Sequence, residues 1–169
     1  MPNRRDFLRS VGRTATGAYL LSHGLGAAAQ GNRKRIMVGG NEIRTVDIHA
    51  HCVFAEVAPL ITGTTMNRPF PDWYVLGDFR LGPMDERGID VAALTVNAYW
   101  WYEADRDLAS QIVRIHDEGL AEWCQRHPDR FVAMTSPALQ FPDLAAEQVE
   151  YAVNDLGMRG VSVGGTVLG

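Results

Sequence analysis

Residues 45–51, TVDIHAH, form the stretch around which the rest of the chain can be interpreted. Its two β-branched apolar residues, Val46 and Ile48, favour a buried strand. Side chains alternate between the two faces of a strand, so His49 and His51 share one face with the preceding acidic residue. Neutral imidazole nitrogens bind zinc and neighbouring divalent metals, and this spacing therefore predicts a metal site. The alternative is two ordinary histidines at a strand end.

The amino-terminal segment, residues 1–30, predicts a twin-arginine (Tat) export signal. Arg4–Arg5 precedes a run of mostly small and apolar residues that extends from Ala15 to Ala29. This run is too short and too rich in glycine for a transmembrane helix, and Ala27–Ala28–Ala29 offers the small residues that a signal peptidase needs. We expect export to the bacterial periplasm by the Tat route. A basic amino terminus that stays attached is the alternative.

The net charge and the two cysteines limit the partners and the disulfide bridges that we expect. The net charge of the 169 residues is −4, and no basic patch indicates nucleic-acid binding. No stable membrane span is expected. Cys52 and Cys124 form no CxxC motif, which leaves packing as the interpretation and one disulfide bridge as the alternative. Cys52 points away from the face of the strand that carries His51, so we do not expect it to bind metal.

Strand and helix patterns alternate along the rest of the chain. This order predicts a parallel sheet with helical crossovers, either an open doubly wound sheet or a (β/α)₈ barrel. No GxGxxG follows the first strand, whereas histidines at the carboxyl end of a strand suit the barrel. The expected elements are a hairpin at 34–44, strands at 45–51, 89–97, 131–136 and 160–163, helices at 81–87, 107–127 and 144–156, and a long polar loop at 55–77.

Four sequence blocks in this order resemble the amidohydrolase-related superfamily (amidohydrolase family 2), in the branch that contains aminocarboxymuconate-semialdehyde decarboxylase. They are residues 46–51, 84–90, 127–131 and 156–161. The resemblance implies an α/β fold of the (β/α)₈ TIM-barrel type, truncated after about four strands. Residues 31–169 are then the N-terminal half of the barrel, and the remaining metal ligands and the acid/base residue lie beyond residue 169.

The resemblance also implies one divalent metal ion, commonly zinc, with His49 and His51 as its first two ligands. The expected activity is that of a metal-dependent amidohydrolase-type enzyme, a hydrolase or a non-oxidative decarboxylase, on a small carboxylated, cyclic or aromatic substrate. A TatD-like metal phosphodiesterase is one alternative, and a catalytically inactive truncated fragment or binding module is another. We expect this chain alone to be inactive. A homodimer is left open.

Further residues are candidates for the substrate pocket. Trp100 follows the second strand and can stack on a planar substrate, or the loop packs its own rings. Asn97 ends the same strand and can donate a hydrogen bond to a substrate oxygen, or it serves only the edge of the core. Arg68 lies in the long loop where decarboxylase relatives carry a carboxylate-binding arginine, with plain solvent exposure as the alternative. We expect Asp47 to be a hydrogen-bond partner, either of a metal-binding residue or within the barrel interior, rather than a ligand.

The other histidines are assigned no role in the site. His116 lies inside a predicted helix, and His127 lies at its end, where a cation complements the helix dipole. Both are expected to be structural. His23 belongs to the predicted signal segment and is excluded.

Overall fold

The structure, a computed structural model, describes residues 33–96 and 99–167. The elements of the fold lie in one compact unit, residues 34–169. The predicted signal segment at 1–30 lies outside the described residues. Among the residues that are described, no helix is long and apolar enough to cross a membrane.

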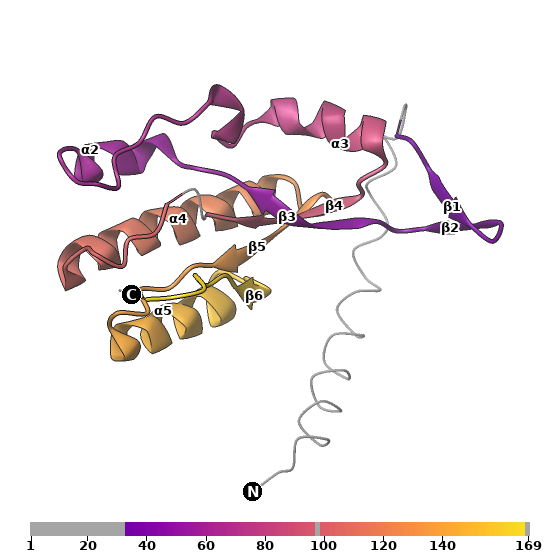
Figure 1. Cartoon of the computed structure of the whole chain (residues 1–169). Helices are drawn as coiled ribbons and strands as arrows, with labels where there is room; N and C mark the ends of the chain where they lie inside the picture. The colour runs from indigo at the N-terminus through magenta and orange to yellow at the C-terminus, as the bar shows by residue number, and fades with distance from the viewer. Residues whose placement is uncertain (1–32, 97–98, 168–169) are drawn as a thin grey trace, which may run out of the picture. The chain divides into compact units, whose positions relative to one another are not determined.

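A four-stranded parallel sheet forms the centre of the fold (Figure 1). Its strands follow one another in sequence order, which differs from a doubly wound sheet, where the order reverses. Parallel strands in sequence order that are joined by right-handed crossovers, the general rule, have their connecting helices on one face, as in a barrel. The strands are β3 (Val46–His51), β4 (Val91–Thr95), β5 (Phe131–Thr135) and β6 (Gly160–Val161).

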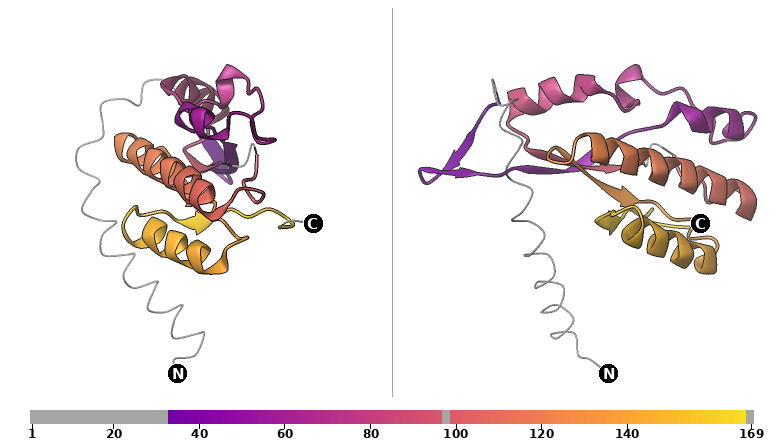
Figure 2. Two further views of the ribbon diagram at one scale, coloured as in Figure 1. Left: turned by 90° about the vertical axis from the view of Figure 1, so that its left-hand side faces the viewer. Right: turned by 180° about the vertical axis from the view of Figure 1, so that it is seen from behind.

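Three helices connect these strands, and local signals fix their ends. Gly88 has a positive φ of 73° and ends α3, where a Cβ atom would lie 2.8 Å from the Lys34 carbonyl oxygen. The side chain of Asp105 accepts a hydrogen bond from the Leu108 backbone N–H at 2.9 Å and caps α4. Figure 2 shows α4 and α5 on the same side of the sheet. The helices are α3 (Leu81–Arg87), α4 (Arg106–Arg126) and α5 (Pro142–Asn154).

The hairpin and the long loop complete the fold. The hairpin lies at the amino end of β3 (Figure 1) and turns at two glycines with positive φ. The loop after β3 is less irregular than expected, because it contains short helical turns. These elements are β1 (Ile36–Val38), β2 (Asn41–Ile43), η1 (Ala55–Val57), α2 (Ala58–Ile61), η2 (Asp72–Tyr74) and η3 (Asp78–Arg80).

The core lies between the sheet and α4. Every residue of β4 is buried, and Leu94 and Phe131 of the sheet pack with Ile112 of α4. The expectation that β3 is a buried strand was wrong, since Val46 is 54% exposed and Ile48 is 76% exposed. Strand β3 lies at the edge of the described sheet and pairs only with β4, so one of its flanks has no neighbour.

Candidate metal centre

The two histidine side chains at the end of β3 converge. The Nε2 atoms of His49 and His51 lie 3.0 Å apart, and the ring centroids are separated by 4.5 Å at an interplanar angle of 66°. Strand alternation alone would place the two residues on one face without fixing the distance between their nitrogens. The observed geometry presents two nitrogen atoms to a single point.

An irregularity in the strand accompanies this convergence. The register between β3 and β4 shifts between Asp47 and Ala50. Within this shift the backbone N–H of His49 donates a hydrogen bond to Oδ1 of Asp47 at 2.9 Å. Asp47 therefore serves the backbone beside the site, and it replaces a hydrogen bond that a regular ladder would have supplied.

His51 is held by two residues that the sequence did not single out. Its Nδ1 lies 2.7 Å from Oγ1 of Thr95, the residue paired with it on β4. Its carbonyl oxygen accepts a hydrogen bond from the guanidinium of Arg80 at 2.8 Å. The same guanidinium nitrogen donates to the carbonyls of Trp73 and Tyr74 at 3.2 and 3.0 Å. Arg80 thus ties the end of β3 to the following loop.

The electrostatic environment favours a neutral His51. Burial lowers the pKa of His51, the neighbouring His49 ring and Arg80 lower it further, and Asp47 opposes them. A neutral imidazole is the form that binds a metal ion. Since two ring nitrogens converge and one ring has its other nitrogen engaged by a hydroxyl, the donor set fits a divalent metal. Within the described residues, no group of three or more His, Cys, Asp or Glu side chains gathers for metal binding.

The predicted substrate residues are less well defined. Arg68 is exposed in the loop after α2. Trp100 is partly buried and stacks on Tyr102, with centroids 5.3 Å apart and planes at 10°. Its neighbours Tyr99 and Trp101 are buried in the core, whereas Trp100 keeps part of its surface exposed. Asn97 lies outside the described residues.

His116 and His127 lie in other parts of the fold. His116 is 2% exposed and contacts the rings of Phe54, Tyr99 and Trp101, and burial lowers its pKa to about 3. His127 caps the end of α4 with its Nε2 3.2 Å from Oδ1 of Asp78. Both histidines have structural surroundings.

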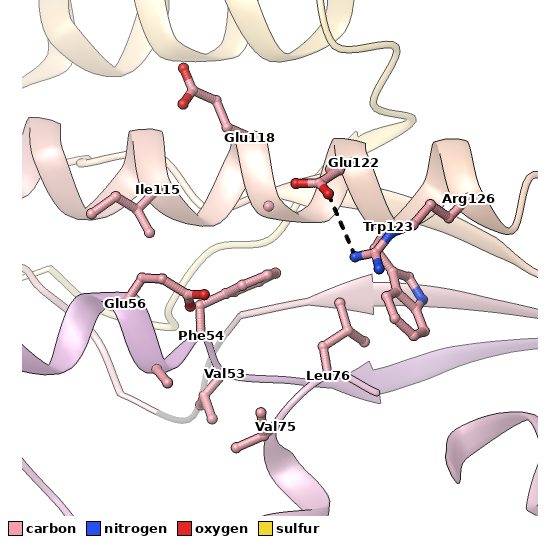
Figure 3. A pocket seen from close by; sticks show the side chains of 12 residues that line it. Val53, Phe54, Glu56, Val75, Leu76, Ile115, Glu118, Glu122, Trp123 and Arg126 are labelled. Atoms are coloured by element: carbon pink, nitrogen blue, oxygen red, sulfur yellow. Dashed lines mark ion pairs between the residues drawn. The ribbon is translucent and has the colours of Figure 1, made fainter. Parts of the chain in front are cut away.

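A separate groove of about 500 Å³ lies between α4 and the segments 53–56 and 75–76 (Figure 3). Its walls combine apolar side chains with Glu56, Glu118, Glu122 and Arg126, and Glu122 and Arg126 form an ion pair at 3.8 Å. Neither histidine of the pair lines this groove. We place the candidate site at His49 and His51, because the groove offers no converging ligands.

Comparison with known proteins relates the chain to aromatic acid decarboxylases. A γ-resorcylate decarboxylase from Rhizobium radiobacter is 43% identical over 89 residues, which cover 52% of this chain and 27% of that relative. The crystal structure of 2,6-dihydroxybenzoate decarboxylase from Rhizobium superposes with a TM-score of 0.61 at 33% identity, over 72% of this chain and 38% of that one. A dihydroxybenzoic acid decarboxylase from Polaromonas, solved with manganese and 2-nitroresorcinol, gives 0.61 at 29% identity over the same shares.

These relatives are longer than the matched region, and the chain spans 27% of the γ-resorcylate decarboxylase. The parallel sheet of this chain, with its helices, corresponds to part of the (β/α)₈ barrel of the solved relatives. A family model for amidohydrolases matches residues 46–169, which include both histidines and all four strands of the sheet. The chain belongs to the amidohydrolase family.

Proposed function

We propose that this chain carries the His-x-His metal site of a metal-dependent, non-oxidative decarboxylase that acts on a small hydroxylated aromatic carboxylate. The observation that carries the proposal is the 3.0 Å approach of the Nε2 atoms of His49 and His51. The decarboxylases among the relatives supply the reaction class. The family also contains hydrolases, so the geometry of the histidine pair alone does not choose the reaction.

The proposed reaction breaks the bond between a ring carbon and its carboxylate. Carbon dioxide leaves, and the ring carbon keeps the electron pair and takes up a proton. A bound divalent ion supplies Lewis-acid stabilisation of negatively charged substrate oxygens. His49 and His51 hold the ion, Trp100 offers a ring face to the substrate, and Arg68 binds the carboxylate. The proton donor is not assigned to any residue of this chain.

The identity of the metal stays a prediction. The sequence suggested zinc, whereas the Polaromonas relative was solved with manganese. Neutral imidazole nitrogens bind both ions, so the identity of the remaining ligands decides the preference. We propose a divalent ion and expect Mn²⁺ to support the reaction.

A chimera tests the proposal most sharply. Residues 46–169 replace the structurally matching segment of the Rhizobium 2,6-dihydroxybenzoate decarboxylase, of which the match covers 38%. The product of 2,6-dihydroxybenzoate, 1,3-dihydroxybenzene, is measured by chromatography. We expect turnover with Mn²⁺, loss of turnover in His49→Ala and His51→Ala, and full turnover in the control His127→Gln. The 169-residue chain alone should show none, because it supplies only two of the ligands that a catalytic metal needs.

Three results would contradict the proposal. A chimera that binds Mn²⁺ and hydrolyses a phosphodiester such as bis(p-nitrophenyl) phosphate, without decarboxylation, would support the TatD-like alternative. A chimera whose metal content is unchanged by His49→Ala and His51→Ala would place the metal elsewhere. Retained activity in both alanine variants would have the same meaning.

A further inference from the structure

Thr95 lies directly beside the ring of His51. It ends β4, is 3% exposed, and lies opposite His51 in the parallel register. Its carbonyl oxygen accepts a hydrogen bond from the Cys52 backbone N–H at 3.0 Å, which fixes the two strands side by side. Its Oγ1 lies 2.7 Å from Nδ1 of His51. The backbone pairing therefore holds the hydroxyl at a fixed place relative to the ring.

The other nitrogen of His51 faces His49. An imidazole that binds a metal through Nε2 carries its proton on Nδ1, because a neutral ring has only one N–H. That N–H then needs an acceptor, and in metal sites the acceptor orients the ring and increases the basicity of the bound nitrogen. A threonine hydroxyl can accept such a hydrogen bond. Oγ1 of Thr95 is at the required distance.

We propose that Thr95 is a positioning residue for the metal centre: its Oγ1 accepts the Nδ1–H of His51 and aims Nε2 at the ion shared with His49. The hydroxyl acts through the ring and does not touch the metal. This inference rests on the proposed function, since it assigns a role toward the same ion. It also makes a statement about the metal-free ring, namely that Nδ1 of His51 carries the proton.

Two substitutions separate this role from packing. Thr95→Val keeps the branched shape and the strand preference but removes the hydroxyl. Thr95→Ser keeps the hydroxyl but removes a buried methyl group. A packing role predicts that Ser is the more damaging change. The positioning role predicts the opposite order for metal binding.

The first experiment measures the Mn²⁺ dissociation constant of the full chain by electron paramagnetic resonance, together with urea unfolding. We expect Thr95→Val to weaken Mn²⁺ binding about 10–100-fold, the usual loss when a metal ligand loses its hydrogen-bond partner. Thr95→Ser should bind within about threefold of the wild type although its unfolding midpoint is lower. Equal binding by Thr95→Val and the wild type would overturn the inference.

The second experiment distinguishes failure of this inference from failure of the proposed function. Long-range ¹H–¹⁵N spectra of the metal-free chain, labelled at histidine and assigned with His51→Gln, report which ring nitrogen carries the proton. We expect Nδ1–H in the wild type and in Thr95→Ser, and a mixture of tautomers in Thr95→Val. A proton on Nε2 in the wild type, or spectra unchanged by Thr95→Val, would overturn the role of Thr95. Mn²⁺ binding that is indifferent to both histidines would instead contradict the proposed function.

Discussion

The replacement Asp117→Asn should change how stability depends on pH. Asp117 lies on α4, is 2% exposed, and accepts a hydrogen bond from the Thr135 hydroxyl at 2.7 Å through Oδ2. Its Oδ1 is buried without a hydrogen-bond partner within the described structure. Burial raises the pKa of Asp117 from 3.8 to about 7, although the hydrogen bond from Thr135 opposes the shift.

The sign and size of the effect follow from the two pKa values. Between pH 4 and pH 7 the folded state keeps a proton on Asp117 that the unfolded chain has released. The stabilising contribution is therefore complete below pH 3.8 and is lost as the pH rises toward 7. Each pH unit between the two pKa values is worth about 1.4 kcal/mol, and the dependence ends near the folded pKa of about 7. The free energy of unfolding should therefore fall by about 3 kcal/mol between pH 5 and pH 8, nearly all of it below pH 7.

Urea unfolding of the wild type and Asp117→Asn at several pH values measures this effect. The asparagine can still accept the Thr135 hydrogen bond but does not titrate. Because His116 is present in both proteins, its contribution cancels in the difference. We expect the wild type to lose about 3 kcal/mol relative to the variant between pH 5 and pH 8. Asp107→Asn, at an exposed position of the same helix, is the control. A difference that stays constant with pH for Asp117→Asn would refute the reasoning.

Three other predictions concern the loop, the groove and the amino terminus. Arg80→Met removes three hydrogen bonds to backbone carbonyls, although the Tyr74 carbonyl keeps the Val53 N–H as a donor, so we expect a loss of about 2–3 kcal/mol in urea unfolding and faster thermolysin cleavage in 62–77. Unchanged cleavage would argue against the role of Arg80 in tying the loop to the end of β3. Gly119→Ala should destabilise by about 1–3 kcal/mol, because its Cβ atom would lie 2.5 Å from the Phe54 ring, whereas Gly82→Ala in open space should be neutral or stabilising. Two lysines in place of Arg4–Arg5 should abolish export, and undiminished periplasmic protein would refute the Tat route.

The sequence predicted the regular elements well because their signals are local. The helix expected at 81–87 has those bounds in the structure, with Gly88 as its end. The helix expected at 107–127 is α4, which begins after the Asp105 cap and ends before Pro128. Amphipathic spacing and end signals depend on neighbouring residues, so they can be recognised without knowing the tertiary fold.

Features that depend on pairing between distant segments were missed. Ile48 looks like a core residue, yet it is 76% exposed on β3, the strand at the edge of the described sheet. Thr95 reaches His51 only because of the register between β3 and β4. The turns in the loop at 55–77 depend on the carbonyl contacts of Arg80 and on the bridge between Val53 and Val75. Register and edge position are properties of the assembled sheet and are not encoded in any short stretch.

The central claim is that His49 and His51 hold one divalent ion together through their converging nitrogens. Electron spin echo envelope modulation of the Mn²⁺-loaded chimera at pH 7.5 tests it directly, because the method counts the imidazole nitrogens coupled to the ion. The account predicts one coupled nitrogen fewer in either His49→Ala or His51→Ala than in the unsubstituted chimera, and an unchanged number in His127→Gln. A number of coupled nitrogens that neither alanine substitution lowers would contradict it.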